Sequence, residues 1–364
     1  MVIGVLKEWF DNKVGLVPAV VKKLIAKGYT VQIETKSGRS SYIANADFEA
    51  AGAIIKERDE IFKSSDILIS FTPIKEEEYK KFKKGVVYIS NFKPYIYKDV
   101  AEKLQKYEIQ AFSLDMIPRS SIAQSMDVLS SMSSIAGYKA VLKAADLLPR
   151  YFPMLITSAG SVKPAKVLVI GAGVAGLQAI ATAKRIGAIV EAVDTRLETE
   201  DEVKSLGGKF LKVEGANQSV SQGYGSEQTD EFIQKQREMM FKHITEADVI
   251  ICTATVRSTK APVIVTKEMV ENMRRGSVII DLASDAGGNC ELTEDGKSVI
   301  HNYVHIIGNS NLSDGAVVDA STLFANNIYN FLNHISDSDL KLKSTDHDEI
   351  YTSSCISNCN LVTN

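Results

Sequence analysis

The most constraining feature of this sequence is a glycine-rich turn between an apolar strand and a helix, in KVLVIGAGVAGLQAIATAKRIGAIVEAVD (166–194). Gly171, Gly173 and Gly176 have the G-x-G-x-x-G spacing, and a second apolar strand ends at Asp194. Such glycines permit the turn, the close approach of a pyrophosphate and tight helix–strand packing, while the helix N-terminus offers amide donors to the phosphates. The pattern therefore predicts a dinucleotide site. Its expected phosphate-contacting residues are Gly171, Ala172, Gly173, Val174 and Gly176.

The acidic residue at the end of the second strand indicates which dinucleotide to expect. A carboxylate at the position of Asp194 accepts hydrogen bonds from the adenosine ribose hydroxyls and repels a 2′-phosphate. Arg196 argues in the other direction, because an arginine nearby can accommodate a 2′-phosphate. Asp194 carries more weight because only this residue lies at the strand end, so we expect NAD rather than NADP.

Strand-like and helix-like segments alternate through both halves of the chain. In the first half, apolar runs such as 2–8 and 66–71 alternate with helical stretches such as 18–28, and the pattern resumes after a long helical segment at about 122–148. Such alternation predicts parallel, doubly wound sheets. We therefore expect an α/β fold with two Rossmann-like doubly wound parallel-sheet domains joined by long helices. The expected domains are 1–125 together with about 320–364, and 126–319.

Composition excludes several classes of function. The 364 residues are 45% hydrophobic and 24% charged, which is ordinary for a globular protein, and their number suits two domains. A net charge of −3 gives no field that would attract nucleic acid or acidic lipid. We find no apolar run long enough to span a membrane and no secretory signal. The tail from Ser336 is polar, so no structure is expected there.

The four cysteines predict neither a metal site nor a disulfide. Cys252 and Cys290 lie far apart in apolar or turn contexts, whereas Cys355 and Cys359 have a C-x3-C spacing in the polar tail. No second pair completes a zinc site. We therefore expect free thiols in a reducing compartment.

A dehydrogenase acting on an alcohol or amine needs a general acid or base near the nicotinamide, and candidates are few. Asp285, in DLASDAGGNCE, follows a strand end where either a catalytic carboxylate or a turn residue fits. Hydride transfer directly between two nicotinamides would need no such group, only proximity and orientation of the rings. The histidines, which we expect to be ordinary surface or packing residues, are His243, His301, His305, His334 and His347.

A second polar constellation precedes the long helical segment, in MIPRSSIAQSMDVLSS (116–131). If this stretch is helical, Gln124, Asp127 and Ser130 follow at steps of three and share one face. A local interpretation is a capping box, Ser121-x-x-Gln124, in which Gln124 only completes the helix start. The residues alone favour the local interpretation slightly.

Several motifs together resemble the NAD(H)-binding component of proton-translocating NAD(P) transhydrogenase, whose nearest relative is alanine dehydrogenase. Residues 1 to about 290 carry the resemblance, which fades after about 300. The motifs are GAGVAGLQAIATAKRIGAIVEAVDTR, SAGSVKPAKVLVIGAG, IPRSSIAQSMDVLSS, IAGYKAV, QGYGSEQTDEFIQKQRE and DLASDAGGNCE.

The resemblance implies an assembly rather than a free-standing enzyme. The chain would be an NAD(H)-binding homodimer that docks on a membrane-embedded proton-channel subunit and on a subunit that binds NADP(H). Hydride would pass from NADH to NADP+, coupled to proton translocation. The chain would then lie on the cytoplasmic or matrix-like side, peripheral to the membrane through its partners.

The resemblance also implies roles for individual residues. Arg119 and Asp127 would pair to hold the shape of a loop that positions the nicotinamide, and with Gln124 they form the expected catalytic set. Gln124 would bond the ribose or carboxamide side, and Ser130 the carboxamide. The implied remaining cofactor contacts are Thr195 and Arg196 beside the adenosine, Tyr224 as a lid residue with Gly223 as its hinge, and Gln236 and Thr255 lining the same site.

Departures from the family pattern leave two other interpretations open. In the nicotinamide loop, Ile122 stands where an arginine is expected and residues 132–134 stand where a Gln-Ala-Asn run is expected. Lys13 also stands where an arginine is expected, and TATVRSTKAP and GNSNLSDGAVVDAS differ from the usual runs. One alternative is an amino-acid dehydrogenase like alanine dehydrogenase, although the chain lacks that enzyme's substrate-side lysine and histidine. The other is a non-catalytic NAD-binding regulatory protein.

Overall fold

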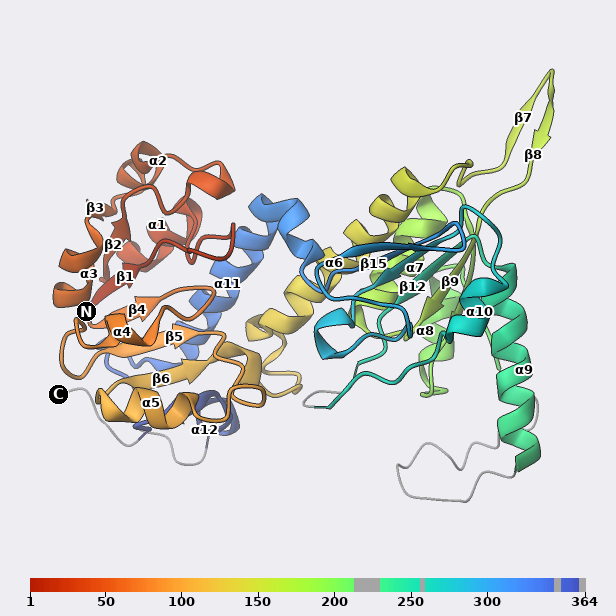
Figure 1. Cartoon of the computed structure of the whole chain (residues 1–364). Helices are drawn as coiled ribbons and strands as arrows, with labels where there is room; N and C mark the ends of the chain where they lie inside the picture. The colour runs from red at the N-terminus through yellow and green to blue at the C-terminus, as the bar shows by residue number, and fades with distance from the viewer. Residues whose placement is uncertain (213–229, 256–258, 344–347, 360–364) are drawn as a thin grey trace. The chain divides into compact units, whose positions relative to one another are not determined.

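The chain divides into two compact units, each with its own seven-stranded sheet. Unit 1 comprises Met1–Met132 and Asp314–Asn364, and unit 2 comprises Ser133–Ser313. The computed structural model describes residues 1–212, 230–255, 259–343 and 348–359 (Figure 1). Across these residues no helix has both the length and the apolar character needed to span a bilayer.

Unit 1 is built on a sheet with the strand order β16-β6-β5-β4-β1-β2-β3. Neighbouring strands are parallel except β16, which pairs antiparallel with β6 at the edge. Strands β1 to β6 therefore have the doubly wound order 3-2-1-4-5-6. Their bounds are β1 Val2–Val5, β2 Thr30–Glu34, β3 Ile54–Lys56, β4 Ile67–Ile69, β5 Val87–Ser90, β6 Gln110–Ser113 and β16 Cys355–Ser357.

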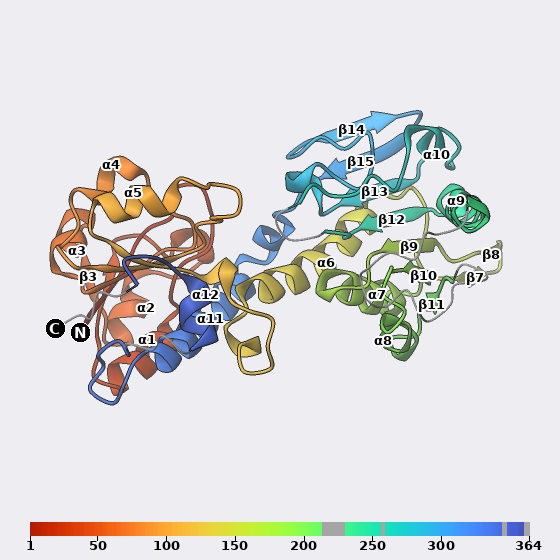
Figure 2. The same cartoon turned by 90° about the horizontal axis from the view of Figure 1, so that it is seen from below.

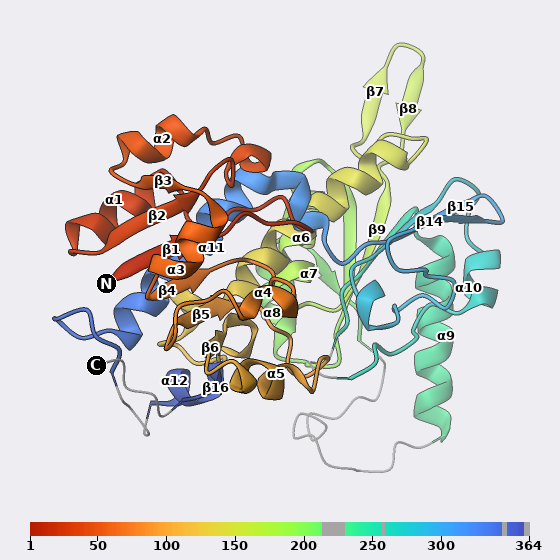
Figure 3. The ribbon, with the colours of Figure 1, turned by 60° about the vertical axis from the view of Figure 1, so that its left-hand side comes forward.

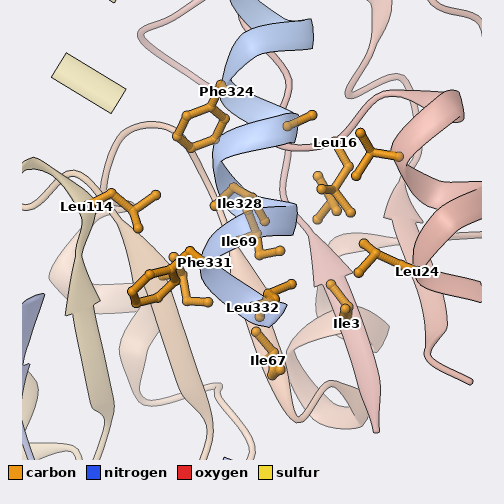
Figure 4. Close-up of a cluster of buried hydrophobic side chains, with 14 of the residues drawn as sticks. Ile3, Leu16, Leu24, Ile67, Ile69, Leu114, Phe324, Ile328, Phe331 and Leu332 are labelled. Atoms are coloured by element: carbon orange, nitrogen blue, oxygen red, sulfur yellow. The ribbon is translucent and has the colours of Figure 1, made fainter. Parts of the chain in front are cut away.

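Helices cover both faces of the unit 1 sheet and bury two separate cores. On one face, strand residues such as Ile3 and Ile67 pack against α1 and α11, which contribute Leu24 and Phe331 among others (Figure 4). On the other face, α3, α4 and α5 cover the alternate strand residues, including Tyr88. The helices of unit 1 are α1 Pro18–Ala26, α2 Asn45–Ala50, α3 Arg58–Ser64, α4 Glu76–Tyr79, α5 Val100–Lys106, α11 Val317–Ile335 and α12 Glu349–Ser354.

Unit 2 has the strand order β11-β10-β9-β12-β13-β15-β14, parallel throughout except at the β14–β15 edge pair. Alternate residues of β9 enter separate cores: Val167 and Val169 pack with residues of α7 and α8, whereas Leu168 and Ile170 pack with residues of α9 and α10. Figure 2 shows these helices beside the unit 2 sheet. The strands are β9 Lys166–Ile170, β10 Ile189–Val193, β11 Lys209–Phe210, β12 Val249–Cys252, β13 Val278–Asp281, β14 Ser298–His301 and β15 Val304–Gly308. The helices are α7 Val174–Arg185, α8 Thr199–Ser205, α9 Asp230–Glu246 and α10 Lys267–Glu271, together with α6 Val128–Leu147, whose first turn belongs to unit 1.

These two parallel-dominated sheets confirm the predicted α/β fold with two Rossmann-like domains. Several edge elements were not predicted, among them β14 and the hairpin β7 (Leu155–Thr157) and β8 (Gly160–Val162), which projects from the unit 2 sheet (Figure 3). The hairpin strands are short and largely exposed, so they lack the apolar run that marks a buried parallel strand.

The expectation of an unstructured tail and four free thiols is wrong in part. Residues Glu349–Ser354 form α12, and Cys355 begins β16 against β6. A turn through Asn358, which has a left-handed φ of 50°, brings Cys359 back so that Cys355 and Cys359 form a disulfide with their Cα atoms 5.7 Å apart. Cys252 and Cys290 are buried free thiols, as predicted.

Candidate functional site

The glycine turn lies at the end of β9, and its three glycines meet three different constraints. Gly171 has a φ of +94°, and a Cβ there would lie 2.7 Å from the Thr253 hydroxyl. A Cβ on Gly176 would lie 1.8 Å from the carbonyl oxygen of Gly171, so only glycine lets α7 pack this close to the turn. Gly173 is the N-cap residue of α7, and a Cβ there would meet no atom of the described residues within 4 Å other than those of its two chain neighbours. The space over Gly173, beside the amides of the α7 N-terminus, is where a phosphate can approach the backbone.

Asp194 follows β10, and its carboxylate is held against the glycine turn. The backbone N–H of Ala172 donates to Asp194 Oδ2 at 2.7 Å, and Arg196 donates from its backbone N–H and its guanidinium. Burial acts to raise the pKa of Asp194, but the hydrogen bonds from Arg196 and Ala172 outweigh it and lower the pKa below the ordinary value. The structure thus brings an ionised carboxylate beside the predicted phosphate turn, while Thr195 and Arg196 lie exposed next to it.

The end of β12 is hydrogen-bonded to the same glycine turn through Thr253, a residue that the sequence analysis did not identify. The Thr253 hydroxyl donates to the carbonyl oxygens of Ile170 and Gly171, at 3.1 and 2.8 Å. The Asn289 side chain accepts from the N–H of Ala254 at 2.9 Å and donates to its carbonyl oxygen at 2.8 Å. Thr255 follows as an exposed residue. A threonine directly after the apolar run of β12 is the sequence signal that marks this anchor.

Asp281, at the end of β13, is a fully buried carboxylate that organises the DLASDAGGNCE segment. Asp281 accepts the backbone N–H groups of Ala283, Asn289 and Cys290, at 3.0, 2.7 and 3.0 Å, and the Thr293 hydroxyl at 2.7 Å. Four donors make this carboxylate a structural anchor rather than a free base. Asp285 lies exposed in the short 3₁₀ helix Ser284–Ala286 that the anchor supports.

In the polar 116–131 segment of unit 1, the α-helix begins later than the sequence pattern predicted. A 3₁₀ helix, Gln124–Met126, precedes the α-helix, which begins only at Val128. The Asp127 carboxylate accepts the backbone N–H of Ser130 at 2.9 Å and its hydroxyl at 2.6 Å, so Asp127 caps α6 and the Ser121–Gln124 capping box does not start it.

Arg119 and Gln124 are exposed on the same segment. Within the described residues no ion pair joins Arg119 to Asp127, whose carboxylate is instead bonded by Ser130. The segment is held instead by Asn327 and Asn330 of α11, whose side-chain amides donate to the Ser125 carbonyl oxygen at 2.9 and 3.1 Å. Ile122, which stands where the family pattern has an arginine, is 74% exposed.

Only some of the other predicted cofactor contacts lie among the residues that the structure describes. Gln236 lies partly exposed on α9. Tyr224 and Gly223, the expected lid and hinge, lie outside the described residues. Three of the described histidines are each paired with a carboxylate: His243 with Glu191, His301 with Glu271 and His334 with Asp348.

In unit 1, the ammonium group of Lys13 is fully buried and committed to protein carboxylates. Lys13 forms ion pairs with Asp11, at 3.0 Å, and with Asp314, and its ammonium lies 4.3 Å from the centre of the Phe71 ring. This charge is therefore neutralised internally at the carboxyl end of the unit 1 sheet.

Glu8, on the same edge, predicts a measurable pH dependence of stability. Burial raises the pKa of Glu8 to about 7, against hydrogen bonds from Thr72 and Phe71 that lower it, and the charge of Asp11 adds to the rise. The Glu8 carboxyl therefore binds its proton more tightly in the folded state than in the unfolded state. The resulting contribution to the free energy of unfolding is complete below pH 4.5 and is lost as the pH rises to about 7. We expect the difference in free energy of unfolding between the wild type and Glu8→Gln to fall by about 1–3 kcal/mol between pH 4.5 and 7.5. Urea unfolding at both pH values measures the two free energies of unfolding. Glu49→Gln, at an exposed site, is the matched control. The same change in free energy of unfolding with pH in all three proteins would contradict the prediction.

Comparison with known proteins identifies one family for both parts of the chain. The model of the alanine dehydrogenase/PNT N-terminal domain matches residues 4–136, and the model of the C-terminal domain matches residues 140–364. The chain belongs to the alanine dehydrogenase/PNT family. The C-terminal match extends well beyond residue 290, where the motif resemblance ends.

Three relatives locate the chain within the alanine dehydrogenase/PNT family. A Rhodospirillum rubrum protein, which is a portion of NAD(P) transhydrogenase subunit alpha, is 42% identical over 356 residues, covering 95% of this chain and 93% of that protein. The solved transhydrogenase from Sinorhizobium meliloti is 34% identical, with a TM-score of 0.90 over 100% of both chains. A solved L-alanine dehydrogenase is more distant, at 26% identity and a TM-score of 0.76 over 91% of this chain and 88% of that one.

Proposed function

We propose that this chain is the NAD(H)-binding component of a proton-translocating NAD(P) transhydrogenase. One observation carries the proposal, which is the 42% identity to a transhydrogenase subunit alpha protein over 95% of the chain. When bound, NADH would supply a hydride to the nicotinamide of NADP+ on a partner subunit, leaving NAD+ and NADPH. Proton translocation would take place in a membrane-embedded partner.

The residues of unit 2 fit an NAD molecule. Apart from its two chain neighbours, no described residue stands within 4 Å of the Cβ position of Gly173, which leaves a cradle for the pyrophosphate at the α7 N-terminus. Asp194 lies beside it as an ionised carboxylate, and we propose that it binds the ribose hydroxyls once the Arg196 guanidinium has left it. We propose that Gln236 and Thr255 line the same cofactor, and that Gln124 and Ser130 serve its nicotinamide end.

The hydrogen bonds of the buried carboxylate in unit 2 are consistent with direct hydride transfer. Asp281, the buried carboxylate at the end of β13, accepts three backbone N–H groups and a hydroxyl, so its contacts serve the structure of the 281–293 segment. Hydride transfer between two nicotinamides needs only that the rings be held close and aligned, and the chain would contribute one of them.

We further propose that the chain acts as a homodimer, peripheral to the membrane through its partner subunits. Support for a self-association surface comes from the β7–β8 hairpin, whose flanking and strand residues Met154 and Ile156 are 61% and 74% exposed. Apolar side chains on a projecting hairpin favour burial against another protein surface.

A mixing assay tests the function. The purified chain, an NADP-binding component, NADH and an oxidised NADP analogue are combined, and analogue reduction is followed. Fast reduction that requires this chain supports the proposal. Alanine deamination by the chain alone would support the dehydrogenase alternative, and NADH binding without any hydride transfer would support a regulatory role.

Replacing Gln124 by asparagine is expected to slow hydride transfer by about tenfold or more, while the Kd for NADH stays within about threefold. The shortened amide would misplace the nicotinamide without touching the adenosine half. Stopped-flow transfer and fluorescence titration measure the two quantities. Gln105→Asn, an exposed position on α5, is the matched control. A collapse of NADH affinity in Gln124→Asn would show that the assigned role is wrong.

A further inference from the structure

The Asp194 carboxylate has no acceptor position left for a ribose hydroxyl. Its Oδ1 accepts the backbone N–H and the Nε–H of Arg196, at 2.8 and 3.1 Å. Its Oδ2 accepts the N–H of Ala172 and a terminal guanidinium N–H of Arg196, at 2.7 and 3.0 Å. An ionised carboxylate offers about four lone-pair positions, and all are used. Ribose hydroxyls can bind Asp194 only if two of these donors leave.

The donors that can leave are those of the Arg196 side chain. The N–H groups of Ala172 and Arg196 belong to the backbone, and the Arg196 carbonyl oxygen is itself held by the N–H and hydroxyl of Thr199, at 3.2 and 2.8 Å. The Arg196 side chain is 51% exposed, whereas that of Asp194 is 8% exposed. An ion pair with one partner in water exchanges at little cost, so the guanidinium can move while the carboxylate stays.

We propose that Arg196 is a specificity-determining residue, whose guanidinium holds the Asp194 acceptor positions that ribose hydroxyls would use and can act as a receptor for a 2′-phosphate when it is not held there. This inference rests on the proposed NAD(H) site. NADH displaces the guanidinium with its two ribose hydroxyls. NADPH is rejected because the Asp194 charge both repels the 2′-phosphate and retains the arginine that would otherwise pair with it.

The surroundings limit how strong the latent receptor can be. Glu198 and Glu202 lie close enough to favour the charged guanidinium, and both would oppose a phosphate. Removing the Asp194 charge should therefore give a moderate gain in NADPH affinity rather than a complete change of cofactor.

The test is a double-mutant cycle on the full chain, with Kd for NADH and NADPH measured by fluorescence titration. The wild type should bind NADH about a hundredfold more tightly than NADPH. Asp194→Asn, which keeps the side-chain shape, should weaken NADH by about tenfold and tighten NADPH by about tenfold. The NADPH gain should disappear in Asp194→Asn/Arg196→Gln. Arg196→Gln alone should keep NADH affinity within about threefold or improve it. Arg185→Gln, the same charge change at an exposed position of α7, should change neither Kd.

Two other outcomes would overturn the inference, and a third would overturn the proposed function. A NADPH gain that persists in the double variant overturns the inference, because the phosphate would then have another receptor. NADH binding that is tight in the wild type and falls more than about tenfold in Arg196→Gln also overturns it, since the arginine would then be a direct contact rather than an occupant. If neither the wild type nor Arg185→Gln binds NADH, the proposed function itself fails.

Discussion

Replacing Gly173 by alanine is expected to raise the Kd for NADH by about a hundredfold while changing the free energy of unfolding by less than about 1 kcal/mol. Apart from its two chain neighbours, the new Cβ meets no atom of the described residues within 4 Å, so the fold tolerates it. It fills the space through which the pyrophosphate would approach the α7 N-terminus. Fluorescence titration with NADH and urea unfolding give the two numbers.

Gly176 supplies the matched contrast, because it is three residues away in the same turn. Its Cβ would lie 1.8 Å from the Gly171 carbonyl oxygen, so Gly176→Ala must push α7 away from β9 and should cost roughly 3 kcal/mol or more of stability. Stability and affinity should therefore separate in Gly173→Ala and fall together in Gly176→Ala. Similar stability losses in both variants would contradict this account of the turn.

The second large effect is expected at Asp281. Asp281→Ala leaves three backbone N–H groups and the Thr293 hydroxyl without their buried acceptor, which should lower the free energy of unfolding by about 3–5 kcal/mol. Thr293→Val removes only one of the four donors and should cost about 1 kcal/mol. Urea denaturation followed by circular dichroism compares them. If the two variants are equally stable, the carboxylate does not organise the 281–293 segment.

Much of the fold follows from the sequence because its signals are local and repeated. The apolar runs of β9 and β12 must be buried on both faces, which predicts parallel strands, and the glycine spacing predicts the turn between β9 and α7. Edge elements such as β16 escape this reasoning, because their stability comes from pairing with a strand far away in the chain rather than from their own apolar pattern.

The candidate site shows the same division at the level of single side chains. Asp194 could be placed from its position at a strand end. The ion pair that saturates it could not, because it depends on the rotamer that Arg196 adopts. Asp127 bonds the Ser130 hydroxyl and N–H at the start of α6 rather than the Arg119 side chain that the resemblance implied. The helix begins at Val128, later than the sequence pattern predicted.

Unit 1 is built from two segments that are far apart in the sequence, and this affects the order in which the protein folds during synthesis. Its first core lacks Phe324, Ile328, Phe331 and Leu332 until α11 has been translated, whereas unit 2 is one continuous stretch that is complete by Ser313. Unit 2 can therefore fold on the ribosome while the first 132 residues, already made, wait with an uncovered apolar sheet face. A nascent chain stalled before α11 would be a natural client for a chaperone.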